Sequence, residues 1–457
     1  MVWAAAALFL TGAAWAAPEK SAGRPHAPAK RTTSAAHAYT LDELIVLAEK
    51  NFPKVQEAQA RLSIKKGQVW EARTAPYSEF KVDGGVGVAP TIRGTPVYSP
   101  SNDVALTKNM ALAWQVGLEG LIPLWTFGKI TSLWDAARAN VELGRHEVER
   151  ERNQVRLDVR RAFYGVLLAR DSRILLNEAT RRLDEHIAKL EADVAAGEGD
   201  DIELLKMKMQ RAELSARGTE ADKGERTALA GLRFYCGIEG AISIVDQPLT
   251  PIKHHLGSVV RYLEAARLHR PEVNMAKAGI AARRAQVELA KAKLYPDFGL
   301  GISAKVIHSA EVTDQRNPFA RDPANRSSYG MGFVFRWKLN FLPQAAQLAQ
   351  ARAQLNEVRA TERYALGGIA AEVEASYAEA RAAKLRLDAW VEATNYAKQW
   401  MIKIQQGMDL GLSDPGEMLD PAKSYATNKA SQMEALFDYN VALSKLSQAT
   451  GWKGMLR

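Results

Sequence analysis

The chain contains the same structural unit twice, and this duplication is the feature that most restricts its fold. Moving the sequence by 218 residues aligns its two halves, so that Pro53 meets Pro271. Further along, a shift of 214 residues takes over, and Phe127 meets Phe341. Two segments that stay aligned over so long a span indicate an internal duplication of one supersecondary unit.

The two repeats are predicted to span residues 39–245 and 257–457. A linker over 246–256, which contains two prolines, joins them. The matches that fix the register include aromatic, proline and small residues in both halves. They pair Tyr77 with Tyr295, Phe80 with Phe298, Phe163 with Tyr377, Glu178-Ala179-Thr180 with Glu392-Ala393-Thr394, and Gly197 with Gly411.

The N-terminus has the pattern of an export signal. An apolar run over 2–12 is followed by Ala14 and Ala16, the small residues of a signal peptidase site, which predicts a signal peptide over 1–16. No Lys or Arg precedes the run, which suggests that the start codon is misassigned and lies upstream. Residues 17–38 are rich in Pro, Ala and polar residues and are predicted to be a disordered linker.

Two very long helices are predicted, one in each repeat. No proline lies between Pro123 and Pro248 or between Pro343 and Pro415, and proline breaks helix interiors. Apolar residues recur every seven positions from Val148 onward, the seam of helices that pack side by side. The helices are expected at about 128–195 and 344–406, each about 100 Å long at 1.5 Å per residue. An ordinary soluble coiled coil has the same periodicity.

Shorter helices are expected before each long helix, and a return helix after it. Pro53 and Pro271 suit the first position of a helix, where the missing N–H costs nothing. The predicted ranges are 40–50, 53–75 and 201–235 in the first repeat, and 258–269, 271–294 and 415–449 in the second.

Between the short and long helices the period changes from helical to two. Four segments alternate apolar residues with polar residues or glycine, at about 80–90, 111–125, 297–307 and 329–341. Strands of about ten residues with one apolar face are typical of a transmembrane β-barrel. A half-buried soluble sheet packed on helices is the alternative. Aromatic residues at the strand ends, as in an interfacial girdle, are Tyr77, Trp125, Tyr295 and Trp337.

Four strands are too few to close a barrel. An open sheet in lipid leaves two edges of unpaired N–H and C=O groups, each costing several kcal/mol. Single-chain barrels start at about eight strands. If the strands enter a membrane, several chains must therefore share one barrel.

No complete catalytic or metal-binding constellation is found. The 61 Lys and Arg residues are mixed with 52 Asp and Glu residues, so no concentrated basic face predicts nucleic-acid binding. His146-Glu147 starts like a zinc protease motif, but Arg150 stands where the second His is needed. His254-His255 has no nearby acidic ligands, and Cys236 is the single cysteine. We therefore expect neither an enzyme nor a protein with a cofactor or metal.

With these elements in this order, the chain resembles the TolC family of outer-membrane efflux proteins over residues 39–451. The segment 123–128 (PLWTFG) is similar to the family's Pro-Leu-aromatic-Asn/Asp-Gly-Gly turn from strand to long helix. The segments 411–413, 417–420 and 449–451 are similar to its second tip and final helix.

The resemblance implies a mainly helical homotrimer in the outer membrane. Its 12-stranded β-barrel would stand on an α-helical barrel that reaches into the periplasm. The implied partners are a periplasmic adaptor and an inner-membrane pump. The chain would be the passive exit duct of an efflux or type I secretion system for small molecules, metal ions or polypeptides. A periplasmic coiled-coil adaptor or scaffold protein is the alternative function.

The resemblance also implies site residues at the tips of the long helix pairs. An acidic ring that narrows the pore would contain Glu203, Glu417 and Asp420, and the adaptor would contact Gly197, Gly411, Leu412 and Ser413. The bland alternative is that these acids favour helix N-termini because of the helix dipole. The aromatic and basic residues that often hold the family's closed state are replaced here by Met408 and Ser413. We therefore do not expect those interactions to hold this chain in a closed state.

Overall fold

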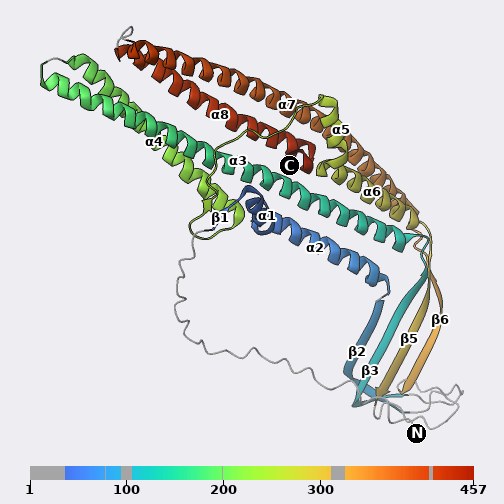
Figure 1. Cartoon of the computed structure of the whole chain (residues 1–457). Coiled ribbons are helices and arrows are strands. Elements are labelled where there is room, and N and C mark those ends of the chain that lie inside the picture. The colour runs from blue at the N-terminus through green and yellow to red at the C-terminus, as the bar shows by residue number, and fades with distance from the viewer. Residues whose placement is uncertain are drawn as a thin grey trace. The chain divides into compact units, whose positions relative to one another are not determined.

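The protein is mainly helical, with one four-stranded sheet at one end of its long helices (Figure 1). The computed structural model describes residues 37–77, 79–93, 105–197, 199–309, 325–410 and 415–456. The predicted signal peptide and residues 17–36 of the predicted linker lie outside this part. Ala38, which the sequence places in the linker, belongs to the short strand β1 (Ala38–Tyr39), parallel to β4 (Ser243–Ile244).

The shorter helices form where capping residues and prolines predict them. In α1 (Leu41–Asn51) the Thr40 hydroxyl accepts from the Glu43 N–H while the Glu43 carboxylate accepts from the Thr40 N–H, a capping box. Helices α2 (Pro53–Thr74) and α6 (Pro271–Ala292) begin at their prolines, as predicted. Helix α5 (Val259–His269) is capped by the Ser258 hydroxyl.

Two long helices are each followed by a return helix. These are α3 (Lys129–Ala195) with α4 (Asp201–Cys236), and α7 (Phe341–Asp409) with α8 (Leu419–Thr450). Helix α7 begins three residues before the predicted position 344. Pro343 fits in its first turn, where backbone N–H groups have no partner within the helix. Helix α8 begins after 415 because residues Pro415–Met418 form a 3₁₀ turn.

The apolar stripes of the long helices make two buried clusters. On α3 the seam residues Val148 and Val155 are buried, and Val155, Val159 and Val166 belong to one cluster with residues of α1 and α4. The second cluster joins α5, α7 and α8. Its fully buried members include Tyr262, Val373, Leu443 and Leu446.

The sheet is antiparallel with the strand order β2-β3-β5-β6. Strands β2 (Glu79–Arg93) and β3 (Ala105–Trp125) are longer than the predicted 80–90 and 111–125. Strand β5 spans Asp297–Ser309. The pairing register shifts after Pro90 and after Pro123, so each proline is accommodated at an irregularity, although it cannot donate to the ladder.

Strand β6 (Arg326–Arg336) ends before the predicted residue 341 because its partner ends there. Asp297 is the first residue of β5 and pairs with Arg336, so residues 337–341 have no strand beside them. The aromatic residues beyond the end of β6 continue the alternating pattern because they pack at the junction with the helices. Trp337 packs edge-to-face on Phe341, with centroids 5.8 Å apart, and its indole N–H donates to the Leu294 carbonyl at 3.1 Å.

The linker between the repeats is an ordered strap rather than a loose connection. The Leu249 N–H donates to the Asp171 carboxylate of α3 at 2.9 Å. The Ile252 N–H donates to the amide oxygen of the buried Asn440 of α8 at 3.0 Å, and Asn440 donates back to the Thr250 carbonyl at 2.9 Å. The strap is thus hydrogen-bonded to α3 and to α8.

Candidate functional site

One face of the sheet is apolar across all four strands. The register aligns Val82 of β2, Leu118 of β3, Ala304 of β5 and Tyr329 of β6 in one row. Because successive residues point to opposite faces, every second residue joins this face. It also contains Phe80, Val86, Val116, Ile122, Phe298, Leu300, Ile302, Met331, Phe333 and Phe335.

The opposite face is polar and rich in glycine. One row aligns Lys81, Glu119, Ser303 and Gly330, so a cation and a carboxylate occupy paired positions on adjacent strands. The next row aligns Asp83, Gly117, Lys305 and Ser328. A Cβ atom added at Gly330 or Gly332 would meet no atom within 4 Å. The polar face therefore opens onto free space.

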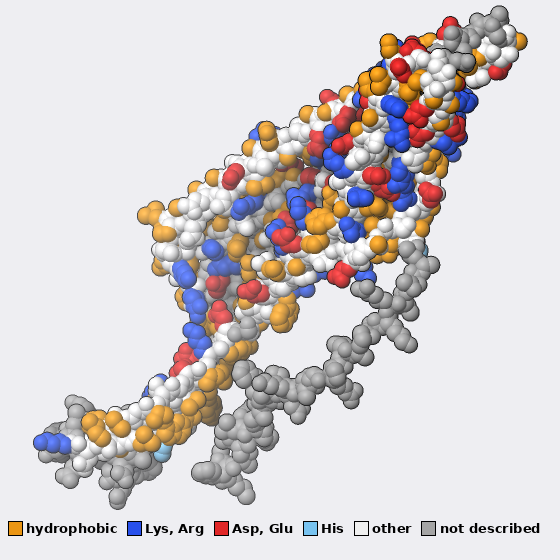
Figure 2. Space-filling model, turned by 90° about the vertical axis from the view of Figure 1, so that its left-hand side faces the viewer, with side chains coloured by type: hydrophobic (Ala, Val, Ile, Leu, Met, Phe, Trp, Pro, Cys, Tyr) orange, Lys and Arg blue, Asp and Glu red, His pale blue; other side chains and the backbone are white. Residues whose placement is uncertain are grey.

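The apolar face is exposed in the single chain. Tyr329 keeps 90% of its surface, Phe333 88% and Val82 74%, whereas side chains of the same types in the helical clusters are almost fully buried. Figure 2 shows hydrophobic side chains gathered along the sheet, at the end remote from the helix tips. Exposed apolar areas of this kind mark an interaction with a membrane or another protein.

The sheet has two open edges. Within the described chain, β2 and β6 stand at the two ends of the strand order and do not pair with each other. Each of these strands leaves one side of its backbone without a ladder partner, and such edges readily pair with another chain.

The junction between sheet and helices is aromatic. Tyr77, Trp125, Tyr295 and Trp337 all lie at the helix-proximal end of the strands and are about half exposed. Phe127 has a positive φ of 50°, an unusual conformation for a bulky residue, and its ring stacks on Tyr295 with centroids 5.1 Å apart. It stands at the first glycine of the family's turn pattern.

An ion pair completes this junction. The Lys129 ammonium group, at the start of α3, lies 2.7 Å from the Asp297 carboxylate at the start of β5, and it also donates to the Tyr295 carbonyl. No sequence pattern predicts this pair or the Phe127–Tyr295 stack. Their partners lie more than 160 positions apart and meet only through the pairing of β3 with β5.

The helix tips carry the predicted pore and adaptor residues. Glu203 is half-buried in the first turn of α4, where Asp200 caps the helix by accepting from the Ile202 N–H at 2.8 Å. Glu417 and Asp420 are exposed, in the 3₁₀ turn and in the first turn of α8. Gly197 is exposed with φ 83°. Gly411, Leu412 and Ser413 lie outside the described residues.

Both tips lie at the end of the helices remote from the sheet (Figure 1). All three acids stand in the first turn of a helix or in the turn before it, so the helix dipole also accounts for their positions. On the first turns of α4, moreover, three apolar side chains spaced three and four residues apart are exposed. They are Ile202, Leu205 and Met209.

Two chemically reactive side chains, Cys236 of α4 and His254 of the strap over 246–256, are packed rather than available. Burial raises the pKa of the Cys236 thiol to about 11, so the nucleophilic thiolate is scarce at neutral pH. The His254 ring lies 2.8 Å from the Tyr262 hydroxyl, and burial lowers its pKa. Among the described residues, no group of three His, Cys, Asp or Glu side chains is arranged to hold a metal ion. No helix in this part of the chain is both long and apolar enough to cross a membrane.

Comparison with known proteins decides the family. The sequence profile described as "Outer membrane efflux protein" matches residues 44–237 and 262–452, together more than four fifths of the chain. The chain belongs to the outer membrane efflux protein family. This efflux protein is 25% identical over 352 residues to Protein CyaE of Bordetella pertussis. The alignment covers 75% of this chain and 69% of the relative.

Solved structures of channel proteins share the fold of this efflux protein. CusC, studied for folding and transmembrane channel formation, superimposes with a TM-score of 0.72 at 15% identity, covering 91% of this chain and 92% of that one. The open state of the Neisseria gonorrhoeae MtrE outer membrane channel also gives 0.72 at 15% identity, covering 90% and 88%. VceC of Vibrio cholerae gives 0.68 at 19% identity, covering 90% and 96%.

The family assignment confirms the predicted function. The chain is an outer-membrane exit channel of a tripartite efflux or secretion system. Its family and fold are those of channel proteins rather than enzymes, and the alternative of a periplasmic adaptor is not favoured.

Proposed function

We propose that three copies of this chain share one 12-stranded β-barrel. The apolar face of the sheet would contact lipid, and β2 of one protomer would pair with β6 of the next. The exposure of this face across all four strands, combined with two open edges, is the observation that carries the proposal. An edge in lipid costs several kcal/mol for each unpaired backbone group, so pairing between protomers is strongly favoured. Members of the family function as trimers.

The same arrangement places the polar, glycine-rich face inside the barrel. Glycines remove side chains from this face, and the paired Lys81 and Glu119 positions leave it without a strong excess of one charge. A wide and weakly charged passage of this kind suits a duct that lets cargo leave. The long helices would extend into the periplasm, and the segment 1–16 would direct export.

Oligomeric state tests this proposal directly. The exported protein, extracted in mild detergent, should have the mass of three 50.2 kDa chains, with the small loss of a cleaved signal. Light scattering coupled to size-exclusion chromatography measures this mass. Incorporation into a planar lipid bilayer should then give stable conductance. A monomer that fractionates without the outer membrane contradicts the proposal.

The acids at the tips are proposed to form the narrow periplasmic end of the pore. Three copies of Glu417 and Asp420, three residues apart, would surround one opening, with Glu203 of the first tip beside them. Such a ring favours cations. Replacing Glu417 by Gln and Asp420 by Asn should lower the cation preference of the bilayer conductance. The matched control replaces Glu239 by Gln and Asp246 by Asn, exposed acids far from the tips.

The tips are also the proposed docking surface for the periplasmic adaptor of an inner-membrane pump. The exposed Ile202, Leu205 and Met209 beside Gly197 support contact with a protein, since an apolar helix face is well suited to pack on another helix. Replacing Leu205 and Met209 by Gln should abolish export in cells and leave the trimer and its bilayer conductance intact. Loss of the trimer in this variant would show that these residues act in assembly instead.

A further inference from the structure

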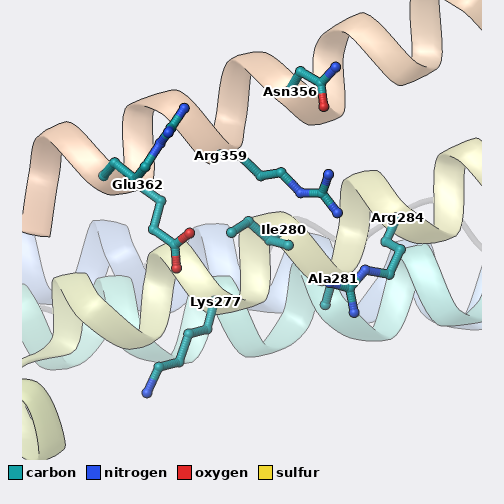
Figure 3. Close-up of a pocket in the computed structure, with 8 residues that line it drawn as sticks. Lys277, Ile280, Ala281, Arg284, Asn356, Arg359 and Glu362 are labelled. Carbon is teal, nitrogen blue, oxygen red and sulfur yellow. The ribbon is translucent and has the colours of Figure 1, made fainter.

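The helices α6 and α7 enclose a groove of about 680 Å³ between them, within the range of pockets that hold small ligands. Its charged lining is unbalanced. Four cations, Lys277, Arg284, Arg359 and Arg363, face it together with a single carboxylate, Glu362. Figure 3 shows Arg359 reaching from α7 toward α6, with Arg284 on α6 and Glu362 farther along α7.

The four groove cations are exposed and have no carboxylate partner among the described residues. Elsewhere, cations that reach between helices meet acids, as Lys65 meets Glu147 at 2.7 Å and Arg170 meets Glu225 at 2.8 Å. Within the described chain, none of the four groove cations forms an ion pair with a carboxylate. Like charges brought together without counter-charges repel one another, and a bound anion relieves that repulsion.

We propose that this groove binds a compact, multivalent oxyanion, that is, a compound with phosphate or clustered carboxylate groups. Arginine fits such groups because its planar guanidinium donates two parallel hydrogen bonds to one oxyanion. Arginines of two helices line this groove, so a ligand in it has donors on both α6 and α7. If the proposed duct is correct, anionic compounds form a cargo class that pauses in its helical part.

The position of the groove favours a soluble anion over a lipid headgroup. Arg284 lies eight residues before the end of α6, about 12 Å along the helix, and Arg363 lies about 33 Å from the start of α7. Both helix ends adjoin the strands. The headgroup layer extends only about 5–8 Å beyond the hydrocarbon core, which is less than either distance.

The test is calorimetric titration of the detergent-solubilised full chain with inorganic pyrophosphate at low ionic strength. We expect saturable binding, weakened about tenfold when Arg284 and Arg359 are both replaced by Gln. Glu362→Gln should act in the opposite direction and tighten binding about threefold, because it removes the one negative charge. The matched control replaces Lys398 and Lys403 of α7 by Gln, an equal change of charge at exposed positions outside the groove, and should leave affinity unchanged.

Three outcomes would overturn the assignment. Wild-type chain that binds pyrophosphate no more tightly than chloride has no such site. Equal weakening by the control pair would mean diffuse electrostatic attraction instead of a groove. Competition by added phosphatidylglycerol would make the occupant a lipid. Both helices belong to one chain, so binding can be measured whether or not the trimer forms, and failure here is distinct from failure of the proposed duct.

Discussion

The sheet and the helical part place the same kinds of side chain in opposite environments. In the helices, Val155, Leu443 and Leu446 are fully buried between neighbours of the same chain. In the sheet, Val82, Phe333 and Tyr329 are 74%, 88% and 90% exposed. The two helical clusters bury their apolar residues within one protomer, whereas the apolar face of the sheet needs a surrounding that the chain does not supply.

The difference shows which part of the molecule depends on its environment. Burial contributes about 25 cal/mol for each Å² of apolar surface, and the helices obtain this from their own packing. The sheet gains this burial energy only from contact with lipid. Its two edge strands gain hydrogen-bonding partners only from sister chains. Folding of the helices and assembly of the barrel should therefore respond to different substitutions.

The largest effect is expected from a charge on the apolar face of the sheet. Phe333→Arg should prevent membrane insertion and trimer formation, since a lipid-facing Arg costs about 2–4 kcal/mol at the bilayer midplane, once in each of the three chains. The neighbouring Gly332→Arg points to the open polar face and is the matched control. Heat-modifiable migration of outer-membrane fractions measures both. Equal loss in the two variants would contradict the assignment of faces.

A smaller effect is expected from a cavity in the helical core. Leu446→Ala removes a fully buried side chain of α8 and should lower the free energy of unfolding by about 2–5 kcal/mol. Denaturation followed by far-ultraviolet circular dichroism measures it. Leu268→Ala, at a position that is 71% exposed, should change stability by about 0.5 kcal/mol or less. The comparison fails if Leu446→Ala blocks membrane insertion but leaves helix stability unchanged.

The smallest effect concerns pH and an ion pair between α3 and the C-terminal residues. Burial disfavours the charged form of Glu149, but hydrogen bonds from Lys453 and Arg152 outweigh it and hold the pKa of Glu149 below its ordinary value. A carboxyl whose pKa is lower in the folded state stabilises that state above the unfolded pKa. The contribution is lost as pH falls from about 4.5 through the folded pKa.

Glu149→Gln should therefore reduce stability at neutral pH and weaken its decline below about pH 5. Melting temperatures across this pH range measure the effect. Glu57→Gln, at an exposed pair within α2, should leave the pH profile as it is in the wild type. A Glu149→Gln profile parallel to that of the wild type would mean that other carboxyls govern acid stability.

Much of the fold could be predicted from local patterns. Prolines at helix starts and the heptad seam located the helices to within a few residues, and the period-two alternation located the strands. The predicted end of a strand was wrong where the neighbouring strand determines it. Strand β6 ends at Arg336 because β5 begins opposite this residue, at Asp297. Glu203, Glu417 and Asp420 were found by resemblance alone, and their pore role stays a prediction.

Long-range contacts could not be predicted. The groove between α6 and α7 brings together residues more than 70 positions apart. Only the packing of these two helices shows that Arg284 and Arg359 face the same space. From the sequence, Phe127 is only a departure from the family's turn pattern. Its stack on Tyr295 could not be predicted, because it depends on the register between β3 and β5.

The strap over 246–256 has a practical consequence for engineering this channel. By composition it is the natural place for an inserted epitope or a protease site. An insertion there would separate Leu249 from Asp171 and Thr250 from Asn440, and so would damage both halves at once. Conversely, a chain cut after Ile252 should stay together through the hydrogen bonds of Thr250 and Ile252 to Asn440, so the two halves can be expressed as separate polypeptides and recombined.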